Sequence, residues 1–329
     1  MFVSLLRRYL QLYWLKPFDA VNDAANAWAL LQFPWQEPIL EVGGGDGAFS
    51  FIMHGGEFDF IADRYDQSDP RRAGDMFDVY REGRPLTVKR RASRVYAAGV
   101  DLKRSHVLKA RETDLYQLLV VSPPEPLPFA DQSFRTVFLY FPHGLVEQGQ
   151  AVNYEEVLKE IHRVLRPDGS LFMTAFNRRV EDAFVCRPLQ RFCARMGWHR
   201  ASEYFRRLDG GRYEEISGLS RTSEQWESLL EKSGFRFLES WTHLSSLAWR
   251  SYDFQTRPIL RMLITCIQQL RPASMKRLVK IVWILLCLPP LCLFYLLFAR
   301  PWRYEPEGNR RTGVLFAFRA TTLESAVKS

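Results

Sequence analysis

The sequence predicts an α/β fold in which helices cover a doubly wound, mostly parallel sheet of seven strands. Two observations lead to this prediction. Apolar, strand-like runs alternate with amphipathic helical patterns along most of the chain. A glycine-dense turn at 43–47 joins the first of these runs to a helix. In such a sheet, ligands bind at the carboxyl ends of the strands.

Two helical patterns open the chain. Residues 3–15 place apolar side chains on a broad helical face, and 19–33 form a second helix that we expect Asp19 to cap. The opening strand follows at 38–42, and either 58–63 or 94–101 could be the second strand. The remaining expected elements are a strand at 116–121, a turn leading into a strand at 126–141, a helix at 154–165, a strand at 170–176, a capping-box helix from 222, and strands at 235–241 and 313–320.

These elements suggest four regions. Residues 1–35 form the N-terminal helices, and 36–250 form a core with an insertion at about 64–93. Residues 251–311 form a basic and apolar helical insertion, and 312–329 hold the final strand and the tail.

Composition narrows the functional classes. The chain has 329 residues and is 47% hydrophobic, which is ample for a core. Its five cysteines form no C-x-x-C pair, and their odd number argues against a disulfide framework, so we expect reduced cysteines in the cytoplasm. The first residues lack the features of a signal peptide. No His/Cys/Asp cluster has metal-ligand spacing, and no basic-aromatic signature of nucleic-acid binding occurs.

The basic charge gathers around the most apolar segment. Between Arg250 and Ala320 there are twelve Lys or Arg and three acids, beside a net charge of +8 for the whole chain. Residues 281–299 contain no charge, and Pro289-Pro290 divide them near the middle. We expect a helical hairpin that dips into one leaflet of an anionic membrane from the cytoplasmic face, with the helix 259–270 and residues 3–15 as candidates to assist it. The alternative is a helical lid buried within the protein or a dimer.

The glycine turn has the form of a nucleotide-binding loop. Gly43, Gly45 and Ala48 satisfy G-x-G-x-x-A, and Gly43, Gly45 and Gly47 satisfy G-x-G-x-G. Glycine allows positive φ and lets a ligand approach the backbone, and the turn ends at a helix N-terminus. The pattern alone does not separate a dinucleotide site from another nucleoside site or from an unliganded turn.

Four blocks in order carry a family resemblance. They are PILEVGGGDG, GVDLKRSHVLKAR, LPFADQSF and EIHRVLRPDGSLFMT, which together span about residues 38–176. In these four blocks and in their order, the sequence resembles the class I S-adenosylmethionine-dependent methyltransferases with a methyltransferase type 11 domain. The fold of that family is Rossmann-like. Departures from the family pattern are Pro123 where an acid or polar residue usually faces the adenine, Arg135 in place of an aspartate, and Asp168 in place of a glycine.

The resemblance implies a site for S-adenosyl-L-methionine. Glu41 and the turn Gly43, Gly45 and Gly47 would hold the amino acid end of the cofactor. The acid of the second strand would accept hydrogen bonds from the ribose hydroxyls. Asp101 is our candidate, with Asp63 as its rival. Leu102 and Pro123 would lie near the adenine, and Tyr140 would wall the pocket or simply belong to the core.

Methyl transfer needs a base only when the acceptor is a weak nucleophile such as a hydroxyl. His143, just past the fourth strand, is the candidate, with loop packing as its alternative role. A small-molecule or lipid-linked acceptor, such as a lipid-linked sugar, a glycan or a quinone-like molecule, would suit a membrane-proximal enzyme. Two other functions stay open, namely an NAD-dependent oxidoreductase and a non-catalytic, membrane-bound protein with the same fold.

Overall fold

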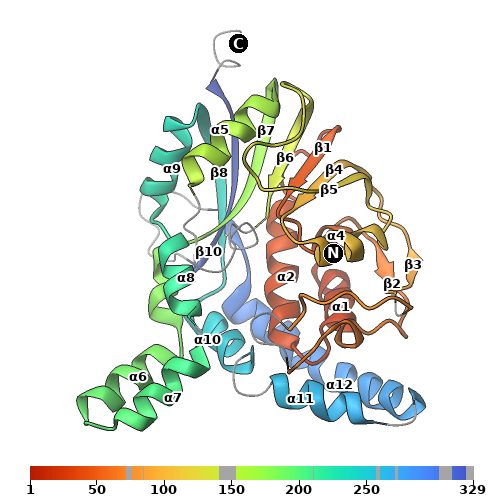
Figure 1. The fold of residues 1–329 in the computed structure, drawn as a ribbon, viewed down its shortest axis with the longest axis vertical. Coiled ribbons are helices and arrows are strands. Elements are labelled where there is room, and N and C mark those ends of the chain that lie inside the picture. The colour runs from red at the N-terminus through yellow and green to blue at the C-terminus, as the bar shows by residue number, and fades with distance from the viewer. Residues whose placement is uncertain are drawn as a thin grey trace.

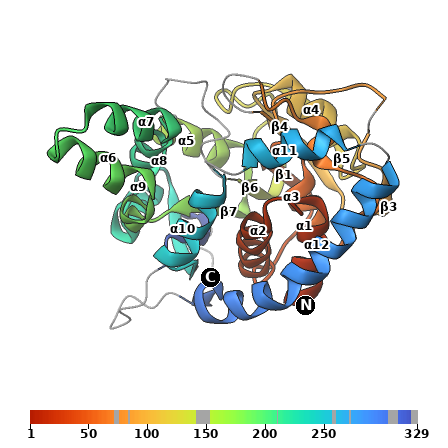
Figure 2. The ribbon, with the colours of Figure 1, turned by 90° about the horizontal axis from the view of Figure 1, so that it is seen from below.

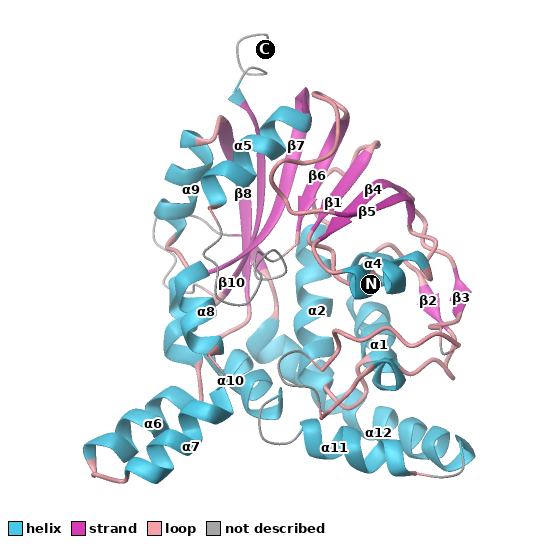
Figure 3. Ribbon diagram, viewed as in Figure 1, coloured by secondary structure: helices cyan, strands magenta, loops and turns pink. Residues whose placement is uncertain are grey.

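A single large sheet forms the centre of the molecule in the computed structural model. The structure describes residues 1–71, 76–83, 85–140, 153–209, 211–256, 260–270, 273–303 and 313–323. The sheet has eight strands in the order β5-β4-β1-β6-β7-β10-β8-β9 (Figures 1 and 3). The alternation of strand and helix patterns in the sequence therefore predicts the fold class correctly.

The first five strands of the sheet are parallel to one another. They are β5 (Tyr116–Val121), β4 (Tyr96–Asp101), β1 (Ile39–Val42), β6 (Phe134–Leu139) and β7 (Leu165–Phe176). The strand β10 (Leu315–Thr322) lies antiparallel between β7 and β8 (Phe235–His243). The sheet is thus mostly parallel, as expected.

The prediction of seven strands is corrected to eight. The additional strand is β9 (Trp302–Arg303), which pairs antiparallel with β8 through Trp241 and Thr242. Two residues are too few to produce a recognisable alternation of apolar and polar side chains. The segment also lies within residues 251–311, for which the sequence predicts a helical insertion.

Two helices precede the sheet, α1 (Phe2–Leu12) and α2 (Pro17–Leu30). Asp19 does not cap α2, because this helix begins at Pro17 with Lys16 as its N-cap residue. Proline is favoured at the first position of a helix, where its missing N–H has no helical partner. Asp19 therefore lies in the first turn and pairs with Lys16 instead.

The segment between α3 (Ala48–Met53) and β4 lies outside the main sheet. It holds the short strands β2 (Glu57–Phe58) and β3 (Val88–Arg90), which pair with each other, and the 3-10 helix η1 (Arg64–Gln67). Of the two sequence candidates for the second strand, 94–101 is thus the one that joins the central sheet.

The remaining helices lie around the sheet and at one end of the molecule (Figure 1). Their bounds are α4 (Arg104–Arg111), α5 (Tyr154–Val164), η3 (Arg178–Ala183), α6 (Cys186–Arg195), α7 (His199–Asp209), α8 (Arg212–Leu219), α9 (Ser223–Lys232), α10 (Ser246–Phe254) and α11 (Leu260–Gln269). The capping box expected before α9 is present, because Thr222 and Gln225 bond reciprocally.

The apolar segment is one helix rather than a hairpin. The helix α12 (Ala273–Phe294) runs through Pro289 and Pro290 without a break and continues as the π-helical turn η5 (Tyr295–Ala299). By length and composition alone, Ala273–Ala299 could cross a membrane. The expected break at the two prolines is wrong: they remove two helical hydrogen bonds, but the helix continues on both sides of them.

Candidate functional site

The candidate site lies where β1 and β4 end side by side. These strands are parallel neighbours, with Glu41 opposite Gly99 and Val42 opposite Val100. The first turn residue continues this pairing, because Gly43 N donates to Val100 O over 2.8 Å. The glycine turn therefore begins against the carboxyl end of β4, at the edge where a parallel sheet binds ligands.

Three glycines give the turn its conformation. Gly43, Gly45 and Gly47 have φ angles of 73°, 60° and 70°, and Gly47 is the N-cap residue of α3. Other residues rarely adopt these angles, which explains the spacing in the sequence. A Cβ placed on Gly45 would meet no atom of the described residues within 4 Å. The backbone at Gly45 thus borders open space that a ligand could fill.

Asp101, the last residue of β4, is fixed to this turn. The residue is 3% exposed, and Oδ2 accepts a hydrogen bond from Gly45 N over 2.9 Å. Oδ1 accepts from Lys103 N over 2.9 Å and lies 3.0 Å from Nδ1 of His106. Each carboxylate oxygen can accept two hydrogen bonds, so Oδ2 keeps capacity for a further donor beside the turn.

Glu41 lies beneath the turn rather than at its surface. It is 1% exposed, and its two carboxyl oxygens accept hydrogen bonds of 2.6 Å from Ser50 Oγ and from the hydroxyl of Tyr116. Gly44 packs directly over it, since a Cβ there would come within 2.7 Å of Glu41 Cδ. Burial raises the pKa of Glu41 to about 7, although the two hydroxyl donors act to lower it.

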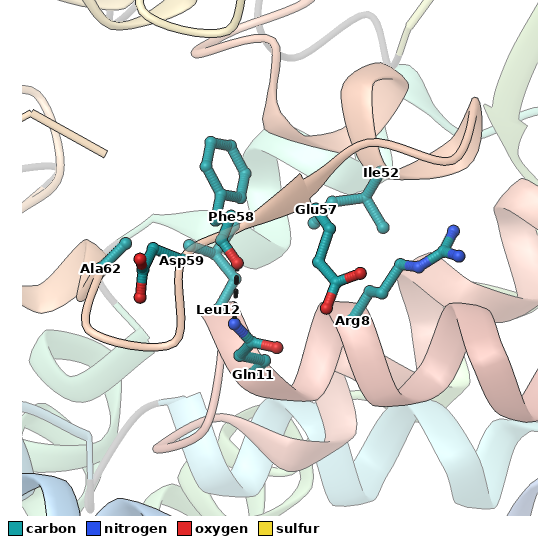
Figure 4. Close-up of a pocket in the computed structure, with 8 residues that line it drawn as sticks. All are labelled: Arg8, Gln11, Leu12, Ile52, Glu57, Phe58, Asp59 and Ala62. Atoms are coloured by element: carbon teal, nitrogen blue, oxygen red, sulfur yellow. Dashed lines mark hydrogen bonds between the residues drawn. The ribbon is translucent and has the colours of Figure 1, made fainter. Parts of the chain in front are cut away.

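The carboxyl group of Asp63, the rival candidate for the second acid, is engaged by residues outside the glycine turn. Asp63 is the N-cap residue of η1, where Oδ1 accepts from Tyr65 N over 3.0 Å. Its Oδ2 lies 2.7 Å from Nζ of Lys276 in α12. The residues before it dock on α1, where Gln11 donates to Phe58 O (Figure 4). The structure thus places Asp101, and not Asp63, beside the glycine turn.

An ion pair that the sequence did not predict joins Asp46 of the turn to Arg64 of η1. Asp46 Oδ2 lies 3.0 Å from Nη2 of Arg64, and Asp46 Oδ1 accepts from Ala48 N. Burial alone would raise the pKa of Asp46, but Arg64 holds it below the usual value. Arg64 also lies over the rings of Tyr13 and Phe77, at 4.8 and 5.0 Å. Segments far apart in the sequence thus meet at the turn.

The other predicted cofactor residues lie around the same edge. Leu102 follows Asp101 and is half-buried, while Pro123 is exposed just beyond β5. These two segments are joined, because Ser122 N donates to Asp101 O over 3.2 Å. Tyr140 follows β6, and its ring stacks on Phe49 of α3 with centroids 4.5 Å apart. His143 lies outside the described residues.

Four residues complete this site beyond those expected from the sequence: Ser50, Tyr116, Arg64 and His106. His106 could have been suspected, since it lies five residues after Asp101 at the start of a helix. No sequence motif indicates the other three residues. Arg64 and Tyr116 in particular reach the turn only through the tertiary fold. Among the described residues no group of three His, Cys, Asp or Glu could hold a metal ion.

Comparison with known proteins supports the resemblance seen in the sequence. Residues 82–173 match a family model described as a methyltransferase domain, which confirms the resemblance over this segment. The match begins inside the segment between α3 and β4, so it includes Asp101 and leaves out the glycine turn. No curated protein matches the chain.

Several solved structures are similar to this chain. One is an S-adenosylmethionine-dependent methyltransferase, a possible histamine N-methyltransferase, from Thermotoga maritima, with 13% identity over 98% of each chain and a TM-score of 0.49. Another is a putative methyltransferase from Bacillus halodurans, with 13% identity over 89% of this chain and 96% of that one and a TM-score of 0.41. A third is an S-adenosylmethionine-dependent methyltransferase from Aquifex aeolicus, with 14% identity over 66% of this chain and 80% of that one and a TM-score of 0.36.

Proposed function

We propose that the protein transfers a methyl group from S-adenosyl-L-methionine to an acceptor, and the match of residues 82–173 to a methyltransferase-domain model supports this proposal. One observation carries the proposal. The carboxyl group of Asp101 and the positive-φ turn from Gly43 to Gly47 meet at the ends of two neighbouring parallel strands, with open space at Gly45. This arrangement suits a nucleoside that carries both a ribose diol and a zwitterionic tail.

The residues present fit such a cofactor. Asp101 would accept a ribose hydroxyl at the oxygen that already accepts from Gly45 N, and its contact with the turn holds it in place. Leu102 and the backbone around Pro123 would border the adenine, since their segments adjoin. Gly43, Gly45 and Gly47 would let the amino acid end approach the backbone, and Tyr140 would wall the pocket.

Glu41 would support the glycine turn from beneath and would supply negative charge near the bound cofactor. Its two oxygens are engaged by Ser50 and Tyr116, and Gly44 separates it from the surface of the turn. A cation bound above the turn would favour the ionised form of this carboxyl, which burial disfavours. Glu41 is therefore a positioning residue that also supplies negative charge beneath a sulfonium and an ammonium group.

The bound cofactor would supply an electrophilic methyl group, and the protein must align the acceptor and exclude water. We propose a hydroxyl acceptor on a lipid-linked, glycan or quinone-like molecule, with His143 as the base that takes its proton. The buried or half-buried free cysteines Cys186, Cys193, Cys287 and Cys292 suit the reducing cytoplasm, where we place the protein.

Calorimetry with three ligands tests the cofactor assignment. The folded protein should bind S-adenosylmethionine and S-adenosylhomocysteine but not NAD. Asp101→Asn should weaken binding about tenfold to a hundredfold, because a hydrogen bond to a charged group contributes roughly 1.5–3 kcal/mol. The matched control is Asp63→Asn, which should change the affinity less than about twofold, since the carboxyl oxygens of Asp63 contact Tyr65 N and Lys276 and not the turn.

Circular dichroism must first show that both variants are folded. No heat with either sulfur nucleoside would remove the proposed activity and favour a non-catalytic protein of this fold. Binding of NAD alone would favour the oxidoreductase. A greater loss for Asp63→Asn than for Asp101→Asn would reject the assigned ribose ligand. Transfer of a radiolabelled methyl group into fractionated lipid, glycan and small-molecule extracts would then identify the acceptor, and His143→Ala would test the base.

A further inference from the structure

The helix α12 presents an apolar face to the outside along its whole length. Its inner face is marked by Lys280, Ile284 and Leu291, which are 3%, 8% and 5% exposed. The opposite face should be polar in an ordinary surface helix. Instead ten large apolar side chains of α12 and η5 are exposed: Met275, Leu278, Ile281, Val282, Trp283, Leu285, Leu286, Leu293, Leu296 and Leu297.

Both ends of this helical segment are tied to the body of the protein. At the N-terminal end, Nζ of Lys276 lies 2.7 Å from carboxyl oxygens of both Asp63 and Asp66. Near the C-terminal end, the ring of Phe294 packs edge-on against Phe18 of α2, with centroids 5.0 Å apart. The segment therefore lies along the protein, and its apolar face points away from α1 and α2.

A second exposed apolar surface lies at the turn between α6 and α7. Phe192, Met196 and Trp198 are 54%, 54% and 55% exposed, and the rings of Phe192 and Trp198 are in edge-on contact. Arg191, Arg195 and Arg200 surround them, and all three are exposed. None of these arginines forms an ion pair with a residue in the part of the chain that the structure describes, and the sequence has no acid between residues 183 and 202.

The two surfaces lie at the same end of the molecule. In Figure 1 the α6–α7 pair and the α11–α12 pair both lie at the bottom, to the left and right of the sheet. Figure 2, which views this end from below, shows both pairs with nothing drawn in front of them. The two helix pairs that carry these surfaces could therefore both lie against one flat partner.

We propose that this end of the protein docks on an anionic phospholipid bilayer, with α12 lying in the plane of the interface and the α6–α7 turn as a second contact. Aromatic and aliphatic side chains flanked by exposed arginines suit the boundary between acyl chains and anionic headgroups. A second copy of the chain would bring arginines against arginines at the α6–α7 turn, which like-charge repulsion disfavours. The docking surface does not depend on the proposed methyl transfer, but it would bring the site to a lipid-borne acceptor.

An in-plane orientation follows from the helix itself. With 22 residues, α12 is about 33 Å long, so length alone would allow a crossing. The prolines at 289 and 290 have no N–H, so they give no helical hydrogen bond to the carbonyls of Leu285 and Leu286. Within hydrocarbon such carbonyls are costly, whereas at the interface water and headgroups can bond them. A crossing would also pull Lys276 away from its two buried or half-buried carboxylates.

Flotation of the full-length protein tests the proposal. The probes are vesicles of phosphatidylcholine alone and of equal parts phosphatidylcholine and phosphatidylglycerol. The protein should float with the anionic vesicles and much less with the neutral ones. Leu285→Glu with Leu296→Glu should abolish flotation, because both side chains are at least 60% exposed and project from the docking face. The matched control is Leu323→Glu, a 44% exposed leucine beside the C-terminal end of β10.

The triple variant Arg191→Glu, Arg195→Glu and Arg200→Glu tests the second contact. Partition to anionic vesicles should fall about a hundredfold, since each surface arginine contributes roughly fivefold. Arg236→Glu, an exposed arginine on β8, should leave partition unchanged. Circular dichroism and the elution volume of each variant report folding and oligomeric state. Equal recovery of wild type in the lipid-free fraction with both vesicle types would overturn the proposal. So would a wild-type dimer that Leu285→Glu dissociates, because the apolar face would then be a protein interface.

Discussion

The replacement Glu41→Gln should remove a pH dependence from the stability of this protein. Burial raises the pKa of Glu41 from its ordinary 4.5 to about 7 in the folded state. Between these values the folded state binds more protons than the unfolded state, so the free energy of unfolding falls as the pH rises. The stabilising contribution of the protonated carboxyl is complete below the unfolded pKa and is lost as the pH rises through the folded one.

The size of the effect follows from the shift. A change of one pKa unit corresponds to 1.36 kcal/mol, so the shift of Glu41 is equivalent to about 3 kcal/mol. Glutamine has the same shape as the protonated acid and does not titrate. Its amide can accept a hydrogen bond from one of the two hydroxyls that bond Glu41 and donate to the other.

Urea unfolding at several pH values measures this difference. At about pH 5 the variant and the wild type should have similar free energies of unfolding, and at about pH 8.5 the variant should be more stable by up to about 3 kcal/mol. Asp23, whose pKa burial raises to about 8, produces a slope of the same sign in both proteins, so the difference between them is the quantity of interest. Glu231→Gln, at an exposed position on α9, is the control and should change stability by less than about 0.5 kcal/mol at every pH. A difference between wild type and Glu41→Gln that stays constant with pH would refute the reasoning.

Three further predictions follow from the same structure. Gly45→Ala should abolish nucleoside binding in calorimetry and cost only about 1–2 kcal/mol of stability, because alanine is strained in the left-handed conformation. Gly44→Ala should lower the free energy of unfolding in urea by roughly 1–3 kcal/mol, because its Cβ would contact Glu41. A larger loss of binding for Gly44→Ala and a larger loss of stability for Gly45→Ala would contradict this prediction. Lys276→Ala should lower the free energy of unfolding by about 3–5 kcal/mol, because it leaves Asp63 buried without its counter-charge. The control Arg277→Ala, at an exposed neighbouring position, should cost less than about 0.5 kcal/mol. Equal losses in urea unfolding would show that the ion pair does not hold α12 in place. Tyr116→Phe should weaken S-adenosylmethionine binding less than Asp101→Asn does. At about pH 8.5, where Glu41 is ionised, it should cost about 1.5–3 kcal/mol of stability because the buried carboxylate loses one donor, and an unchanged urea midpoint would show that this hydrogen bond contributes nothing.

The sequence alone determined the features that depend on local patterns. Alternating strand and helix periods predict the mostly parallel sheet, and the glycine spacing predicts a tight turn, in which the structure shows Gly43, Gly45 and Gly47 at positive φ. The order of the motif blocks indicates a methyltransferase domain, which the match over residues 82–173 confirms. Short segments of the sequence suffice to predict these properties, because neighbours within a few residues determine backbone conformation and side-chain periodicity.

Only the tertiary structure decided which distant groups meet. Asp63 and Asp101 are both acids that follow apolar runs, and nothing local shows that Asp101 adjoins Gly45 while Asp63 pairs with Lys276. Likewise, Pro289 and Pro290 predict a broken helix, but α12 continues through them and keeps its packing against α1 and α2. Packing between segments far apart in the chain contributes more free energy than local propensity, so it decides where a carboxylate is buried, what pairs with it and which face of an apolar helix stays exposed.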